Sequence, residues 1–493
     1  MISRFKNSGK FYSIFAALFF LAASVTAQNS DVQGLVAAML SNTPLISDLE
    51  QLTDEIGGRP TGSQANFKAV EWGVRKFREA GVSARKEAFT MPGLWLGNSA
   101  KAQVSGDEQF PVRVVAMPFS IGTPPEGVTA PLVLVGKGTE TDFRGAGKRV
   151  KGAFVLVETE VLRDIDGLFR EYANAVEIED RAFAAGALGV VYMSSRPQGL
   201  LYRHNASLGF KNSHPMLIMS REHAKRAMRL LRRGKKLQLT ARINVRSGGP
   251  YTSYNVIGEI KGSASPEEFV VIGAHLDSWG LGTGANDNGC NAVMMIDIAR
   301  QMRELGIQPK RTIRFVLWNG EEQGFFGSWG YVKKHQDELD RTVLNCTIDI
   351  GSGRIVGIFT NGRGLLASFV EKALQPVAAF GPFQQINAPI VGTDNYDFMM
   401  EGVANLVANH DPFNYGPNYH AESDTFDKVD LRQLKINSAI IAALAYGFAN
   451  MDITYKRQTR AQVQHIIDNT DLGKEMRMFR LMPDWENGKR GRK

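Results

Sequence analysis

Cysteine is scarce in this sequence, which has only Cys290 and Cys346 in 493 residues. A disulfide framework of the kind that stabilises small secreted domains is therefore excluded. Both cysteines have apolar neighbours, which predicts two buried thiols rather than a bridge. The chain must be stabilised mainly by its apolar cores. Its 43% apolar and 22% charged residues are ordinary for a packed globular protein of two or three domains.

Long apolar runs are also missing. Phe11–Ala23 is the strongest candidate, and it is shorter than the roughly 20 residues that cross a membrane. Basic residues precede it and small residues follow it up to Ala27, the pattern of a signal peptide. We expect cleavage before Gln28, a secreted or periplasmic protein and no stable membrane anchor; an uncleaved anchor is the alternative.

A strong excess of one charge is absent as well. The formal net charge is +8, and residues 1–27 contribute three cations and no anions to it. The remaining basic residues are concentrated in Arg221–Lys236 and Lys474–Lys493, and the first of these runs has no interleaved aromatic residues. Such a run is typical of a solvated helix face, so we expect no nucleic-acid partner.

Changes of pattern along the chain divide it into segments. After the signal peptide, residues 28–114 form the N-terminal part of the main domain, and residues 115–248 form a small α/β unit bounded by Gly- and Pro-rich turns. Strands and helices alternate over residues 249–455, while residues 456–493 are a tail without a clear core period. This alternation predicts an α/β fold with a mixed, mostly parallel central sheet sandwiched by helices.

Charged residues follow several predicted strands at the point where each strand ends. Ligands bind outside the carboxyl ends of the strands in open α/β sheets, so these side chains are candidates for one shared site. Taken singly, each has an ordinary explanation as a satisfied polar residue or a solvated helix start. Together they form a set of two histidines and three carboxylates: His275, Asp287, Glu322, Asp349 and His420.

Asp349 is the most informative of these residues because it ends the strongly apolar segment Val343–Ile348. An unpaired buried carboxylate there would cost several kcal/mol, and a metal ion is a suitable partner. Nitrogen and oxygen donors without thiolates suit zinc in a catalytic site. One catalytic zinc takes about three protein ligands, so five donors predict two Zn²⁺ ions with a bridging carboxylate.

The motifs around these donors resemble, in order and spacing, those of the co-catalytic zinc exopeptidases. This family includes bacterial leucine aminopeptidases, glutamate carboxypeptidases and the transferrin receptor, and the likeness is greatest to its plasma glutamate carboxypeptidase branch. The early loop Gly57–Gly62 and the unit 115–248, which is similar to the family's protease-associated insert, extend the resemblance over nearly the whole mature chain. It is carried by His275-Leu276-Asp277, Asn286-Asp287-Asn288-Gly289, Asn319-Gly320-Glu321-Glu322-Gln323-Gly324, Ile348-Asp349 and Tyr419-His420.

The resemblance implies roles for these residues. Asp287 would bridge the two metals, with His275 and Asp349 completing one site and Glu322 and His420 the other. Glu321 would be the general base, and Asp277 would accept a hydrogen bond from the His275 ring. The family also has a cis peptide bond after its bridging aspartate, here between Asp287 and Asn288. The implied activity is hydrolysis of dipeptides or of terminal bonds in short peptides, and the implied assembly is a homodimer.

Three alternatives remain at this point. The chain could be an aminopeptidase on longer peptides, a one-zinc transferase similar to glutaminyl cyclase, or a non-catalytic receptor-like ectodomain. Five donors exceed what the transferase needs, and degenerate receptors lose ligands that this chain keeps.

The residues that hold the substrate are less certain than the metal donors. Many relatives have Ser-Asp-His where this chain has Thr393-Asp394-Asn395, which leaves specificity open. We assign surface or capping roles to the three histidines of the small unit. Five further residues are candidates to face the pocket: Arg354, Arg363, Asn395, Tyr396 and Tyr415.

Overall fold

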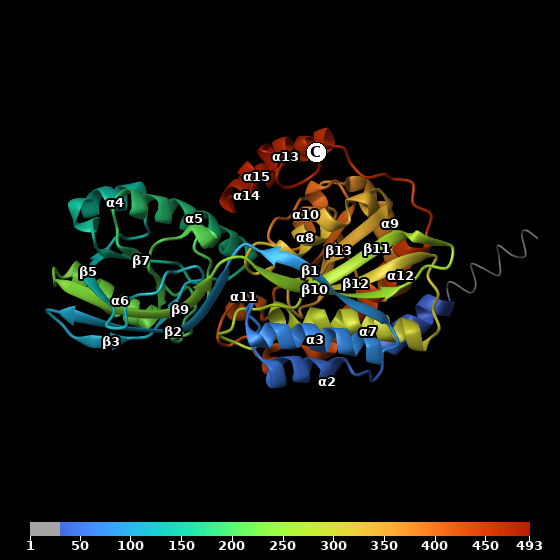
Figure 1. Cartoon of the computed structure of the whole chain (residues 1–493), viewed down its shortest axis with the longest axis horizontal. Helices are drawn as coiled ribbons and strands as arrows, with labels where there is room; N and C mark the ends of the chain where they lie inside the picture. Colours follow the sequence, from blue (N-terminus) through green and yellow to red (C-terminus); the bar gives the residue numbers. More distant parts are fainter. Residues whose placement is uncertain (1–29) are drawn as a thin grey trace, which may run out of the picture.

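The computed structural model of the chain describes residues 30–493. It contains two eight-stranded sheets side by side (Figure 1). The expected signal peptide lies outside the described residues. Within residues 30–493, no helix is long and apolar enough to cross a membrane.

The first sheet carries the strand ends that the sequence pointed to. Its central strands β12, β11, β13 and β16 are parallel, and antiparallel strands flank them, so the predicted mixed sheet is confirmed. In spatial order its strands are β1 (Ser83–Met91), β10 (Tyr251–Ile260), β12 (Arg311–Trp318), β11 (Ser265–His275), β13 (Thr342–Thr347), β16 (Asn405–His410), β14 (Ile355–Phe359) and β15 (Gln384–Ile386).

Helices cover both faces of this sheet because its central strands are apolar on both sides. Val270 and Ile272 of β11 belong to the large core on one face, and the alternate Phe269 and Val271 belong to a smaller core on the other. The first face is covered by α2 (Leu45–Glu50), α3 (Gln64–Glu79), α7 (Cys290–Glu304), α9 (Ala367–Leu374) and α12 (Leu431–Asn450). The second face is covered by α8 (Phe326–Lys334) and α10 (Asn395–Met400). Cys290 and Cys346 are buried free thiols, as predicted.

The second sheet belongs to residues 94–248, which we call the inserted unit; it lies to the left in Figure 1. It has its own apolar core and three helices: α4 (Glu140–Ala146), α5 (Ile165–Ala184) and α6 (Arg221–Arg232). Its strands, in spatial order, are β3 (Phe110–Val112), β2 (Leu94–Gly106), β9 (Leu237–Gly248), β5 (Val128–Leu134), β6 (Phe154–Val157), β7 (Gly189–Met193), β8 (Met216–Met219) and β4 (Val114–Ala116). Strands β2 and β3 thus precede residue 115, where we placed the start of the small unit.

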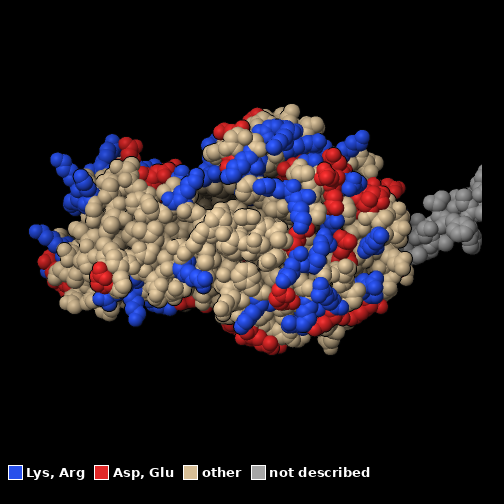
Figure 2. Space-filling view, in the orientation of Figure 1, with Lys and Arg blue, Asp and Glu red and all other residues tan. Residues whose placement is uncertain are grey.

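Residues 456–493, which we call the tail, fold into α13 (Arg460–Asn469), α14 (Leu472–Met478) and α15 (Met482–Glu486). A capping box of Thr459 and Gln462 starts α13. Buried tail residues such as Met476 and Trp485 pack with Tyr396 and Met400 of α10 in a separate apolar cluster. The tail forms the upper lobe in Figures 1 and 2, and α14 lies on its side towards the inserted unit.

Candidate metal centre

The structure brings the five predicted donors together at the carboxyl end of the central strands. His275 ends β11, Glu322 follows β12, and Asp349 follows β13. Asp287 lies in the loop before α7, and His420 follows the short helix α11 (Tyr415–Asn418). All five side chains are buried. The strand-end argument therefore predicted a real cluster.

One group of donors consists of His275, Asp287 and Asp349, which we call the His275 triad. One ligand atom from each lies within 4.8 Å of the others. The His275 Nε2 atom is 2.9 Å from Asp349 Oδ1 and 3.2 Å from Asp287 Oδ1. These are the distances expected when three donors face one central point.

The other group consists of Asp287, Glu322 and His420, which we call the His420 triad. The His420 Nε2 atom is 2.8 Å from Glu322 Oε2 and 3.3 Å from Asp287 Oδ2. Asp287 belongs to both triads, with Oδ1 facing His275 and Oδ2 facing His420. Its carboxylate therefore has the position of a bridge between two sites.

Backbone carbonyls orient both histidine rings. Nδ1 of His275 is 2.9 Å from the carbonyl oxygen of Asp277, and Nδ1 of His420 is 3.0 Å from that of Arg203. A carbonyl only accepts, so each Nδ1 carries the hydrogen and each Nε2 faces the carboxylates. Imidazole with a free Nε2 lone pair is a metal ligand, and a second hydrogen bond of this kind fixes it for that role.

Asp277 accepts a hydrogen bond from the His275 ring, as the resemblance implied, and it does so with its backbone oxygen. Its carboxylate Oδ1 is 3.8 Å from the His275 ring. The carboxylate accepts from the Thr61 hydroxyl at 2.6 Å and, at a longer 3.4 Å, from the Glu321 backbone N–H. Asp277 thus supports the ring through its main chain and ties the early loop to the Glu321 segment.

The loop that carries Asp287 is held from behind by Asp424 and Arg59. The Asp424 carboxylate accepts from the backbone N–H groups of Asn286 at 2.7 Å and of Asp287 at 3.1 Å. Arg59, from the predicted early loop, is fully buried and donates to the Gly284 carbonyl at 2.8 Å. The expected cis peptide bond between Asp287 and Asn288 is present.

The buried negative charge of the cluster indicates that a cation binds there. Burial and neighbouring carboxylates raise the pKa of Glu322 well above its usual value, although His275 opposes this shift. Burial alone would lower the pKa of His275, yet Asp349 and Glu321 raise it well above its usual value. Both shifts express an excess of negative charge in a region removed from water.

Unsatisfied oxygens point to the same conclusion. Asp287 Oδ2, Glu322 Oε1 and Asp349 Oδ1 are buried and have no hydrogen-bond partner among the described residues. Buried polar atoms are normally paired, and a bound metal ion supplies the missing partner. Nitrogen and carboxylate donors in two adjoining triads fit zinc.

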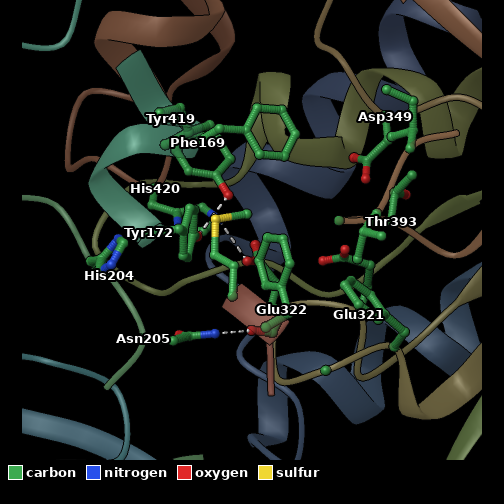
Figure 3. Close-up of a pocket in the computed structure, with 18 of the residues that line it drawn as sticks. Phe169, Tyr172, His204, Asn205, Glu321, Glu322, Asp349, Thr393, Tyr419 and His420 are labelled. Atoms are coloured by element: carbon green, nitrogen blue, oxygen red, sulfur yellow. Dashed lines mark hydrogen bonds and ion pairs between the residues drawn. The ribbon is translucent and has the colours of Figure 1, made fainter. Parts of the chain in front are cut away.

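The triads form the floor of a cavity of about 450 Å³. Figure 3 shows Glu321 and Asp349 on one side and Tyr172, His204 and His420 on the other. Besides the donors, the cavity wall comes from α5 and residues 204–207 of the inserted unit, from residues 390–393 and from Met478, Phe479 and Leu481 of the tail. Figure 2 shows a hollow between the inserted unit and the lobe formed by the tail.

Sequence reasoning missed the residues that the inserted unit contributes. His204 is buried, lines the cavity and packs against Tyr172 with the two rings tilted and their centroids 4.2 Å apart, so the surface or capping role assigned to it is wrong. His223 does lie at a helix start, with Nδ1 2.6 Å from the Ser220 hydroxyl. His214 stacks on Phe183 at 3.8 Å. Of the five further pocket candidates, only Tyr415 is among the residues that line the cavity.

The inserted unit also fixes the His420 segment directly. Besides the Arg203 carbonyl, it supplies Asn205, whose Nδ2 donates to the Glu322 carbonyl at 2.7 Å (Figure 3), and Tyr172, whose hydroxyl is 3.0 Å from that of Tyr419. These contacts surround the His420 triad. No pattern in the sequence predicts them, because they depend on how two separate cores meet.

Comparisons with known proteins agree with this geometry. The sequence profile of Peptidase family M28 matches residues 255–445, which include all five donors. The chain is 27% identical to carboxypeptidase Q of Rattus norvegicus over 412 residues, which cover 81% of this chain and 84% of that protein. It is 24% identical to aminopeptidase YwaD of Bacillus subtilis (strain 168), with 86% of this chain and 89% of that protein covered.

Solved structures show the same architecture. A Peptidase M28 precursor from Shewanella amazonensis SB2B superposes with a TM-score of 0.78 at 27% identity, covering 87% of this chain and 98% of that one. A zinc aminopeptidase from Bacillus subtilis has the same fold, with a TM-score of 0.66 at 22% identity. The family match over the donor-bearing residues, the relatives that cover most of the chain and the shared fold show a zinc metallopeptidase that is similar to the members of Peptidase family M28.

Proposed function

We propose that this protein is a two-zinc exopeptidase that acts on dipeptides and other short peptides with a free amino end. The observation that carries the proposal is the pair of donor triads sharing Asp287 on the floor of the cavity. A cavity of about 450 Å³ is within the usual range for small-ligand sites, which supports a short substrate. The leader-like residues 1–27 support action outside the cytoplasm.

Each triad would hold one zinc ion. His275 and Asp349 would hold one zinc, Glu322 and His420 the other, and Asp287 both. Zinc in such a site lowers the pKa of a water ligand and polarises the carbonyl of the scissile bond.

Glu321 is the residue best placed to move the proton. Its carboxylate lines the cavity but belongs to neither triad, and its Oε2 is 3.9 Å from His275 Nε2. Burial and the nearby carboxylates raise its pKa well above the usual value, although His275 opposes this. A carboxylate with a raised pKa can take a proton from the attacking water and return it to the leaving amine.

The charges around the cavity favour the amino end of the substrate. Among the described residues that line the cavity there is no lysine or arginine. An ammonium group would therefore meet carboxylates such as Glu321, and a peptide carboxylate would find no side-chain cation. This supports an aminopeptidase or dipeptidase over an enzyme that grips a free carboxylate.

One dipeptide offered in three forms tests the proposal with the zinc-loaded enzyme. The free dipeptide and its C-terminal amide should both be cleaved. The N-acetylated form should be cleaved roughly tenfold or more slowly, because it loses a hydrogen-bonded charge. The reverse order would show that the carboxylate end is gripped, and failure to cleave any form would remove the proposed function.

A further inference from the structure

The cavity lining has polar and apolar parts. The donors and Glu321 are polar, as described above. Much of the remaining wall is formed by aromatic and aliphatic side chains from three places far apart in the sequence: α5 of the inserted unit, the segment 390–393 and the tail. We call its outer part, Phe169, Tyr172, Met478 and Phe479, the roof.

The tail is fixed over the cavity by specific contacts with the inserted unit. The Phe479 and Tyr172 rings lie 5.4 Å apart. Next to Phe479, Arg480 donates from Nη2 to Asp180 Oδ1 at 2.7 Å and to the Ser207 hydroxyl at 3.3 Å. The tail is anchored on its other side because Met476 is fully buried in the cluster with α10. The roof therefore has a defined position in the fold.

The roof residues keep part of their apolar surface open to the cavity. Phe169, Tyr172, Met478 and Phe479 are each only half-buried, unlike Met476 in the same helix as Met478. Arg477 and Arg480 flank Met478 and Phe479 in the sequence, but neither lines the cavity. Arg480 is paired with Asp180, and Arg477 is exposed. A charged substrate side chain would lose water at the roof without gaining a partner, while an apolar one would gain contact area.

We propose that the roof is the subsite for one bulky apolar side chain of the peptide, and that Met478 and Phe479 of the tail determine this specificity. The proposal rests on the peptidase function argued above. Met478 and Phe479 lie in the tail, outside residues 255–445, which match the family profile.

The main test compares dipeptides on the full-length, zinc-loaded enzyme. The rates for Phe-Ala, Leu-Ala, Ala-Phe and Ala-Leu are compared with the rate for Ala-Ala. This set detects a side-chain preference at either the first or the second residue of the dipeptide. Apolar pockets discriminate by roughly 10-fold to 200-fold for small changes in a side chain. We expect at least one bulky dipeptide to exceed Ala-Ala by about tenfold in kcat/KM. A wild-type preference for Ala-Ala would overturn the proposal.

Variants locate the preference in the tail. Phe479→Ala and Met478→Ala should each lower the kcat/KM ratio of the bulky dipeptide to Ala-Ala most of the way to one, while the zinc content stays that of wild type. Lys474→Ala, at an exposed position on the same helix, is the matched control and should behave as wild type. An unchanged preference in both roof variants would overturn the proposal. Having two variants keeps the test decisive if one of them does not fold.

A binding measurement separates this inference from the proposed function. Calorimetric titration with free L-phenylalanine should show weaker binding to Phe479→Ala than to wild type or Lys474→Ala. If no dipeptide is cleaved but binding still depends on Phe479, the peptidase proposal fails and the subsite stands. Equal affinity in all three proteins would overturn the subsite.

Discussion

The two donor triads share Asp287 yet are built in different ways. The His275 triad is made and supported by residues outside the inserted unit: its ring is held by the Asp277 carbonyl two residues further along the chain. In the His420 triad the ring is held by the Arg203 carbonyl, which belongs to the inserted unit. One metal site is thus local to the peptidase fold, and the other depends on the docking of a second unit.

This difference has an electrostatic counterpart. Burial lowers the pKa of His420 to about 4, whereas nearby carboxylates raise that of His275 despite its burial. Asp349 and Glu321 gather around His275, so the His275 triad has the greater excess of negative charge. We therefore expect the two sites to differ in their sensitivity to substitution.

The largest effect should come from the adjacent glutamates. Glu321→Gln should keep both zinc ions and lose roughly 10²–10⁴-fold in kcat, because it removes only the proton carrier. Glu322→Gln should release zinc from the His420 triad alone, and Asp349→Asn from the His275 triad alone. Zinc analysis together with kcat measures all three. Zinc loss in Glu321→Gln with full occupancy in Glu322→Gln would reverse the assigned roles, and a normal kcat in Glu321→Gln would exclude it as the base.

A smaller effect should follow from loosening the inserted unit. Asn205→Ala removes the hydrogen bond to the Glu322 carbonyl and should weaken zinc binding at the His420 triad by about tenfold, the low end for groups that support ligands. The His275 triad should be unaffected. Chelator competition, followed as zinc released per chain, measures this.

The matched control for Asn205→Ala is Asn98→Ala. Asn98 lies in the same unit, and its side chain bonds Asn244 at an exposed position. It should retain both zinc affinities. Equal weakening of both sites in Asn205→Ala would show that the inserted unit supports the whole centre and not the His420 triad in particular.

The same comparison explains what the sequence could predict. His275, Glu322 and Asp349 follow neighbouring parallel strands, so the fold class alone brings them to one edge of the sheet. Asp277 accepts the predicted hydrogen bond from the His275 ring, but the sequence did not indicate that its main chain would be the acceptor. Residue types predict side-chain chemistry well and backbone hydrogen bonds poorly.

The inserted unit and the tail could not be placed in the same way. Arg203 acts through a carbonyl that every residue has, and no spacing links it to His420, 217 positions away. Phe479 and Tyr172 look like ordinary core residues because apolar side chains at helical spacing are usually core. Their position over the cavity results from how the tail and the inserted unit meet, which local patterns do not encode.

The smallest effect we predict concerns pH and the support of the His275 triad. His410, at the end of β16, is buried against the Gly351–Gly353 segment that follows Asp349, and burial lowers its pKa to about 4 from the usual 6.5. Between about pH 6.5 and pH 4, His410 is protonated in the unfolded chain and neutral in the folded protein. The free energy of unfolding therefore decreases as pH falls through this window, by about 2 kcal/mol between pH 7 and pH 5.

The free energy of unfolding of His410→Gln should decrease by about 2 kcal/mol less than that of wild type over that interval, as measured by urea unfolding at one zinc concentration. His465→Gln, at an exposed histidine of the tail, is the control and should follow wild type. Equal losses in all three proteins would mean that His410 takes up its proton in the folded state as readily as in the unfolded one.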